Sequence, residues 1–290
     1  MPDGEVALED LRRWVDGLGR GTDLPTEVDY SIFQTASTPI HRYSPRNNEL
    51  RKHDAILYLH GGAFIAGSAL SHGALAANIA VRANAPVYLL DYRKAPEHPY
   101  PAALNDALAA YEMLTAEYES VAIFGDSAGG GLAIATACMI RDSGQQLPSS
   151  LGLISPWVDL TLSGASHHTV GDADPMLSEA ALRAGGGAYA NAASLDDPGL
   201  SPLFADLAGL PPIIIQVGSR ERLKDDSSSL AAKARHAGVS VDFRIWPGMI
   251  HVWHLFGRYL VEASEASDAL ALHYRKNRID GASEPLPPST

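Results

Sequence analysis

Six short apolar runs, rich in β-branched and aromatic residues, are spaced along the middle of the chain. In order they read AILYLH, APVYLLDY, SVAIFG, SLGLIS, PIIIQVG and VDFRIW. Strands that are apolar along their whole length are typical of a parallel sheet buried on both faces. The stretches between and after them are long enough for helices, which we predict over 102–116, 129–142, 225–237 and 257–276. This alternation predicts an α/β fold with helices on both faces of a mostly parallel sheet.

Three further segments lie outside this pattern. ALEDLRRWVDGL places four apolar residues on one face, which predicts an amphipathic helix within an N-terminal helical segment of residues 1–40. Residues 160–205 are rich in Gly, Ala and Asp and show no strand pattern, so we expect an insertion over the carboxyl edge of the sheet. The last residues, GASEPLPPST, predict a flexible tail over 281–290.

The composition argues against several classes of protein. Among 290 residues, 46% are hydrophobic and 19% are charged, as in globular rather than disordered chains. A formal net charge of −12 argues against nucleic acid and anionic membranes as partners, since both attract Lys and Arg. Cys138 is the only cysteine, and no run approaches the roughly 20 apolar residues of a membrane span. With no signal-peptide pattern at the start, we expect a cytoplasmic protein without a nucleic-acid or membrane partner.

Residues 121–131 read VAIFGDSAGGG and place Ser127 directly after one of the apolar runs. A serine on a sharp turn from a strand to a helix exposes its hydroxyl at the end of a parallel sheet, as a nucleophile requires. Gly125 and Gly129, two residues to either side, leave room for the chain to reverse. Because Gly-x-Ser-x-Gly is short enough to arise by chance, the residues that would work with this serine must be identified as well.

An activated serine needs donors for the oxyanion, a base, and an acid that orients the base. His60-Gly61-Gly62 follows the first apolar run, where two glycines let backbone N–H groups turn toward a common point. We predict an oxyanion hole formed by the N–H groups of Gly61, Gly62 and Ala128, with each donor stabilising the transition state by about 3 kcal/mol.

The base and its acid are expected after the last two apolar runs. WPGMIHVWH offers His251 and His254, of which His251 is favoured because it lies nearer the end of the strand. Glu221, Asp225 and Asp226 all follow PIIIQVG, which fits the chain order serine, acid, histidine. Glu221 is favoured because it comes soonest, whereas the aspartates fall in the first turn of a helix, whose dipole stabilises carboxylates anyway. Asp225 stays the main alternative.

A second pair of histidines, His167 and His168, lies near two aspartates within the 160–205 segment. Such a grouping could hold a metal ion. Adjacent histidines in a polar loop are more often simply solvated, and we expect no metal site.

The motifs together resemble those of the hormone-sensitive-lipase-like branch of the α/β-hydrolases, the bacterial family IV esterases. The similar blocks extend over residues 55–260 and read LHGGAF, DYRKAPEHPYPAAL, GDSAGGGLA, SPWVDLT, DPMLS, SPLFADLAGLPP and WPGMIHVW. The resemblance implies an α/β-hydrolase fold with an eight-stranded, mostly parallel sheet. It also implies a small helical cap, built from the N-terminal segment and the 160–205 insertion, on a catalytic domain of residues 41–280.

The resemblance implies a role for each site residue. Ser127 corresponds to the nucleophile and His251 to the base, and the family uses no cofactor. In many relatives the acid is the first residue of an Asp-Pro-Leu-x-Asp stretch, which corresponds here to residues 221–225, ERLKD. Glu221 then stands at the position of the acid, and Arg222 stands where the relatives have proline.

We therefore expect a serine carboxylesterase that hydrolyses short- to medium-chain esters through an acyl-enzyme, without a cofactor or a metal. The same residues would serve an amidase, an arylformamidase, a lactonase or a thioesterase. The alternative outside enzymes is a ligand-binding protein on a hydrolase scaffold. Such proteins tend to lose one of the three catalytic residues, and this chain has candidates for all three. A homodimer through an edge strand or the last helix is compatible with the sequence.

Overall fold

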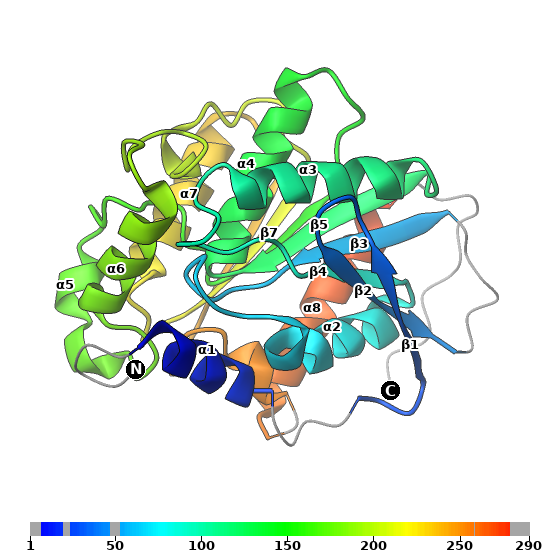
Figure 1. Ribbon diagram of the computed structural model, residues 1–290, viewed down its shortest axis with the longest axis horizontal. Helices are drawn as coiled ribbons and strands as arrows, with labels where there is room; N and C mark the ends of the chain where they lie inside the picture. Colours follow the sequence, from blue (N-terminus) through cyan, green and yellow to red (C-terminus); the bar gives the residue numbers. More distant parts are fainter. Residues whose placement is uncertain (1–6, 20–23, 47–52, 258, 279–290) are drawn as a thin grey trace.

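The computed structural model of the chain describes residues 7–19, 24–46, 53–257 and 259–278. The tail predicted over 281–290 lies outside these residues. Within them an eight-stranded sheet runs through the centre of the molecule, with helices on either side (Figure 1).

The sheet is mostly parallel, as predicted. Its strands are β1 (Val28–Gln34), β2 (Pro39–Pro45), β3 (Asp54–Leu59), β4 (Val87–Leu90), β5 (Ser120–Asp126), β6 (Leu151–Ile154), β7 (Ile213–Gly218) and β8 (Val241–Trp246). Their order in space is β1-β2-β4-β3-β5-β6-β7-β8. Only the β1–β2 and β2–β4 pairs are antiparallel, and the other neighbours pair in parallel.

The six apolar runs of the sequence form strands β3 to β8. Every residue of β3 to β7 is buried, because these strands have a layer of helices on each face. Strands β1 and β2 lack such a run. In β1, which lies at the edge of the sheet, Val28 is the only buried residue, so its sequence is under no demand to be apolar.

Helices pack on both faces of the sheet. The helices of the described chain are α1 (Leu8–Gly17), α2 (Ala69–Ala83), α3 (Ala102–Thr115), α4 (Ala128–Asp142), α5 (Ser166–Thr169), α6 (Glu179–Ala190), α7 (Lys224–His236) and α8 (Val261–Asn277), with 3-10 turns η1 (Gly171–Ala173), η2 (Pro202–Phe204) and η3 (Trp253–Phe256). Helices α3, α4 and α7 contribute to the larger apolar core on one face, and α2 and α8 contribute to a second core on the other (Figure 1). No helix in the described part of the chain has the length and apolar character needed to cross a membrane.

Three of the four predicted helices match α3, α4 and α7 to within about one residue at each end, an ordinary disagreement for helix boundaries. The fourth prediction is wrong at its start. Helix α8 begins at Val261 rather than at residue 257, because the backbone of Leu260 is extended (φ −122°, ψ 124°) and so interrupts any helix that would start earlier.

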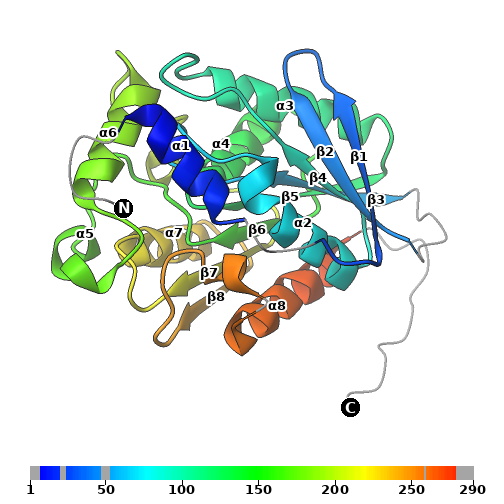
Figure 2. The ribbon, with the colours of Figure 1, turned by 60° about the horizontal axis from the view of Figure 1, so that its bottom comes forward.

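The predicted cap comprises helix α1 and the cap insertion, the name used below for residues 160–205. In the view of Figure 2, α1 lies beside α6 of the insertion. The N-terminal segment predicted as helical over 1–40 needs correction, since Val28–Gln34 forms strand β1. All seven of these residues pair with β2, so this part of the chain belongs to the sheet.

Candidate active site

Ser127 stands on a sharp turn between strand β5 and helix α4. Its backbone has φ 51° and ψ −122°, a conformation that an L-residue adopts only where its surroundings hold it. The flanking glycines are required by close approach: a Cβ on Gly125 would lie 2.3 Å from the carbonyl oxygen of Gly129, and one on Gly129 would lie 2.0 Å from that of Leu59. The turn therefore depends on small residues on both sides of the serine.

Ser127, His251 and Glu221 form a continuous chain of contacts. The Oγ atom of Ser127 lies 3.0 Å from Nε2 of His251, and Nδ1 of His251 lies 2.9 Å from Oε2 of Glu221. A carboxylate oxygen only accepts, so Nδ1 carries the proton and Nε2 is left to accept the serine hydroxyl proton. The three residues follow strands β5, β8 and β7, whose carboxyl ends meet at one edge of the sheet.

The environment of His251 favours its protonated form. Burial alone would lower the pKa of the imidazole, but the hydrogen bond and the negative charge of Glu221 outweigh burial and raise the pKa above its usual value of 6.5. Glu221 is itself completely buried, and its second oxygen accepts hydrogen bonds from Ser155 Oγ (2.8 Å) and from the N–H of Gly218. This carboxylate is therefore held in one orientation toward the imidazole.

The two competing carboxylates lie elsewhere. Asp225 accepts a hydrogen bond from the N–H of Ser166 (2.8 Å), and Asp226 lies 2.8 Å from Nε2 of His167. The structure thus brings Glu221, and not Asp225 or Asp226, to His251. The alternative base, His254, is buried and lies 2.7 Å from the side-chain oxygen of Gln216, and burial lowers its pKa to about 3.

The predicted oxyanion donors need one correction. The N–H of Gly61 donates to Asp126 Oδ1 (3.0 Å), so it is already used within the protein. The close approach of Asp126 explains the glycine, since a Cβ at residue 61 would lie 2.2 Å from the other carboxylate oxygen. Gly62 and Ala63 line the cavity beside Ser127, and within the described chain neither N–H is used in a hydrogen bond. Ala128 begins α4, where first-turn N–H groups have no acceptor within the helix.

Asp126 links the two turns that carry these donors. Besides Gly61, its carboxylate accepts from the Tyr58 hydroxyl (2.9 Å) and lies 3.2 Å from Nε2 of His72. Burial would raise the pKa of Asp126, but His72 and the other hydrogen bonds outweigh it and lower the pKa. The sequence alone does not reveal His72, because it lies within α2 and follows no strand.

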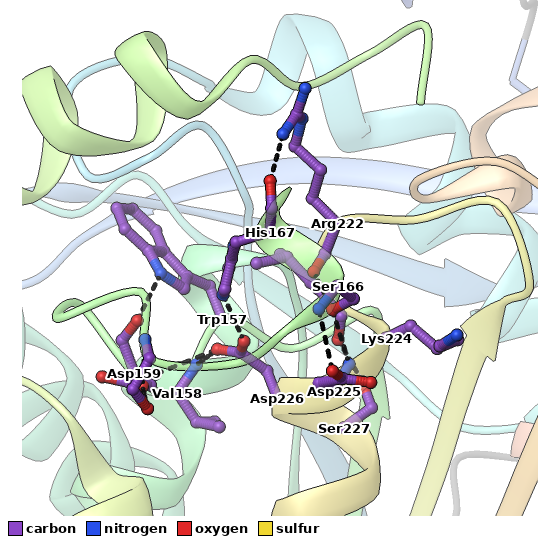
Figure 3. A network of polar contacts seen from close by, with 12 residues as sticks. Trp157, Val158, Asp159, Ser166, His167, Arg222, Lys224, Asp225, Asp226 and Ser227 are labelled. Atoms are coloured by element: carbon purple, nitrogen blue, oxygen red, sulfur yellow. Dashed lines mark hydrogen bonds and ion pairs between the residues drawn. The ribbon is translucent and has the colours of Figure 1, made fainter. Parts of the chain in front are cut away.

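The expectation that His167 and His168 are both solvated is wrong for His167. This imidazole is fully buried against Asp226, whereas His168 is exposed and lies 3.1 Å from Glu179. Figure 3 shows His167 directed at Asp226 across the base of the cap insertion. Among the described residues, no group of three or more His, Cys, Asp or Glu side chains could hold a metal ion.

A cavity of about 930 Å³ opens above Ser127. One wall comes from α1, with Leu11, Trp14 and Val15, and the other comes from the cap insertion, with Met176 and Leu177 among its residues. Most of the lining is apolar. The predicted amphipathic helix at the N-terminus thus directs its apolar face into the cavity.

Comparison with known proteins agrees with this geometry. The sequence model of a family described by its alpha/beta hydrolase fold matches residues 56–255. The chain is 43% identical over 229 residues to an acetyl-hydrolase of Streptomyces hygroscopicus, covering 78% of this chain and 77% of that protein. It is 38% identical over 236 residues to an esterase of Acinetobacter venetianus, covering 79% and 78% of the two chains.

Solved structures are similar over almost the whole chain. An esterase/lipase from an uncultured bacterium superposes with a TM-score of 0.90 at 37% identity, covering 96% of this chain and 93% of that one. An esterase from the bacterial hormone-sensitive lipase family superposes with a TM-score of 0.91 at 34% identity, covering 94% and 93%. The chain therefore belongs to the α/β-hydrolase family and, within it, to the hormone-sensitive-lipase-like esterases.

Proposed function

We propose that this protein hydrolyses carboxylic esters through an acyl-enzyme formed on Ser127. The observation that carries the proposal is the buried chain from Ser127 through His251 to Glu221, which lies at the floor of an apolar cavity. Similar proteins named esterase and acetyl-hydrolase support the same chemistry.

In the first half of the reaction, His251 Nε2 takes the proton of the Ser127 hydroxyl as Oγ attacks the ester carbonyl carbon. The imidazolium that forms is stabilised by the Glu221 carboxylate. The negative charge on the carbonyl oxygen is met by the N–H groups of Gly62, Ala63 and Ala128. His251 then gives its proton to the leaving alkoxide, which departs as the alcohol and leaves the acyl group on Oγ.

In the second half, water replaces the alcohol. His251 takes a proton from the water as its oxygen attacks the acyl carbonyl, and it returns that proton to Ser127 Oγ as the carboxylic acid departs. The residues named here supply every proton transfer of the cycle.

The cavity favours neutral, apolar esters with short to medium acyl chains. Its titratable lining residues are His72, Asp126 and His251, and each is engaged with another side chain. The lining thus offers no free charge to bind an ionised substrate. Amides, lactones and thioesters would use the same residues, and comparing kcat/KM across a substrate panel would separate them.

The sequence composition bears on where the enzyme works and with which partners. A net charge of −12 and a single cysteine, which is buried, support a cytoplasmic enzyme that works without nucleic acid or an anionic membrane as partner. Homodimer formation stays a prediction.

The proposal is tested by Ser127→Ala with p-nitrophenyl butyrate as substrate. We expect the variant to fold as the wild type does and to lose about 10⁵-fold or more in kcat, since no nucleophile remains. A serine-directed phosphonate should add its mass to the wild type and not to the variant. Ester hydrolysis at the wild-type rate in Ser127→Ala, or labelling at another residue, would refute the mechanism.

A further inference from the structure

Arg222 follows Glu221 directly, yet its side chain is engaged with the cap insertion. Its guanidinium donates three hydrogen bonds to backbone carbonyls there: Nε to Leu177 (3.0 Å), Nη2 to Gly171 (3.1 Å) and Nη1 to His167. In Figure 3 the side chain extends away from the start of α7 toward the carbonyl of His167. One side chain thus joins three separate points of the insertion.

The backbone of Arg222 is attached to the same wall of the cavity. Its N–H donates to one oxygen of Asp174 (2.9 Å), and the other oxygen of Asp174 accepts from the N–H groups of Met176 (2.9 Å) and Leu177 (3.1 Å). Met176 and Leu177 line the cavity above Ser127. The segment 174–177 is therefore bonded to residue 222 through Asp174 and again through the carbonyl of Leu177.

The neighbouring carboxylates hold α5 and the segment that directly precedes the insertion. Asp225 bonds Ser166, and Asp226 bonds His167 and the N–H groups of Val158 and Asp159 (both 3.1 Å). These contacts fix α5 to α7 without the Arg222 side chain. Loss of the guanidinium would therefore leave α5 attached and would free mainly the wall that carries Met176 and Leu177.

The geometry suits arginine in particular. Three carbonyls in different directions match the planar, forked set of donors on a guanidinium, whereas a lysine presents its donors from one point. A proline at this position, as in the Asp-Pro-Leu-x-Asp stretch, has no side-chain donors. It also lacks the backbone N–H that donates a hydrogen bond to Asp174 in this chain. In this chain the wall is held by bonds that a proline could not make.

We propose that Arg222 fixes the position of the cavity wall formed by Met176 and Leu177 and thereby determines how well the site accepts acyl chains longer than acetyl. Arg222 is a positioning residue, since it acts through the wall and does not line the cavity itself. The inference rests on the proposed ester hydrolysis. An acetyl group fills little of a 930 Å³ cavity, whereas a longer chain depends on contacts with its apolar walls.

The test compares kcat and KM for p-nitrophenyl acetate and p-nitrophenyl hexanoate. Arg222→Met keeps the aliphatic stem but removes the donors, and Arg222→Lys keeps the charge. Arg220→Ala is the matched control, because Arg220 is exposed and its side chain makes no hydrogen bond to another described residue. All variants are measured at one pH on the plateau of activity.

We expect Arg222→Met to keep kcat/KM for the acetate within about twofold of wild type and to lower the hexanoate-to-acetate ratio at least about fivefold, mainly through KM for the hexanoate. Arg222→Lys should give an intermediate ratio, and Arg220→Ala the wild-type ratio. If Arg222 served only the stability of the fold, the substitution would lower kcat/KM equally for the two esters.

A hexanoate-to-acetate ratio within twofold of wild type in Arg222→Met would overturn the inference. If Arg222→Met does not fold, Arg222→Lys decides in its place, and an unchanged ratio there overturns the inference. Failure of the proposed function looks different, because the wild type would then hydrolyse neither ester faster than Ser127→Ala does.

Discussion

Helix α1 and the cap insertion both line the cavity above Ser127, but they are attached to the rest of the protein by different means. Arg12 of α1 forms an ion pair with Glu97 (2.7 Å), in which the side chains are 27% and 51% exposed. The same guanidinium donates to the carbonyls of Ile65 (2.8 Å) and Ala95 (3.1 Å). The insertion is held instead by Arg222, which is partly buried, and by the buried carboxylate of Asp226.

The two walls are attached to the reacting residues in different ways. A partly exposed ion pair such as Arg12–Glu97 is screened by water and salt and contributes about 1 kcal/mol or less, so α1 depends more on its apolar face and on the bonds from Arg12 to the two carbonyls. The residues that hold the insertion lie in the same stretch of chain as Glu221, within five positions of it. The insertion is therefore held from the loop that carries the acid of the site, whereas the contacts of Arg12 in α1 lie far from that loop in the sequence.

Among the residues 221–226, the largest effect is expected at Glu221, which contacts the imidazole of His251. Glu221→Gln should lower kcat about 10³-fold or more, because an amide no longer stabilises the imidazolium and can favour the wrong tautomer of His251. Asp225→Asn is the matched control, since Asp225 bonds Ser166 and not the imidazole. A loss of kcat in the control equal to that in Glu221→Gln would return Asp225 to consideration as the acid.

The pH profiles of the wild type and Glu221→Gln test whether the charge of Glu221 raises the pKa of His251. His251 must be neutral to accept the serine proton, and Glu221 raises its pKa, so wild-type activity should rise with pH through a midpoint above 6.5. Without the negative charge, burial lowers the pKa of the imidazole, so the residual activity of Glu221→Gln should rise at a lower pH than in wild type. Midpoints that coincide would contradict the assignment of Glu221 as the partner of His251.

A smaller effect, on stability, is expected at Asp226. Asp226→Ala leaves His167 and the N–H groups of Val158 and Asp159 without their shared acceptor in a buried site. We expect the free energy of unfolding to fall by about 3 kcal/mol, measured by urea denaturation. The corresponding change on the α1 side, Glu97→Ala, should lower it by less than about 1 kcal/mol. Equal losses in the two variants would remove the distinction between the walls.

The residues at the floor of the site could be predicted from the sequence because each follows an apolar strand. Ser127, Glu221 and His251 come within five residues of the ends of β5, β7 and β8, and parallel strands bring their carboxyl ends together whatever the details of packing. The position of each residue along the chain and the topology of the sheet are then enough to predict that these side chains meet. The same reasoning finds the turn after β3, with Gly62 in it.

Choices between partners far apart in the chain could not be predicted. Whether the N–H of Gly61 meets a substrate or a carboxylate depends on Asp126, which is 65 positions away. The contacts of Arg222 with the insertion span 45 to 55 positions, and no local pattern encodes them. His167 was expected in solvent because its neighbours in sequence are polar, yet Asp226 provides a buried partner for it.

The smallest effect is expected at Glu97, and it tests how weakly α1 is held. The hydrogen bond from Arg12 lowers the pKa of Glu97 to about 2, so the carboxylate is charged throughout the working range and acid removes the ion pair only as the pH falls toward that value. Salt is therefore the better probe. Glu97→Gln should raise KM for p-nitrophenyl hexanoate by less than about threefold and leave kcat unchanged.

Raising the ionic strength to about 1 M, where the screening length falls to about 3 Å, should weaken the Arg12–Glu97 pair and raise KM for the hexanoate in the wild type by less than Glu97→Gln does, with almost no effect on Glu97→Gln itself. The insertion should not respond in this way, because Asp226 is shielded from solvent. An Arg222→Met variant should therefore show the wild-type dependence of KM on salt. If Arg222→Met instead lost the salt dependence seen in the wild type, the contacts of Arg222 would be sensitive to salt as well. The insertion and α1 would then not differ in how they are held.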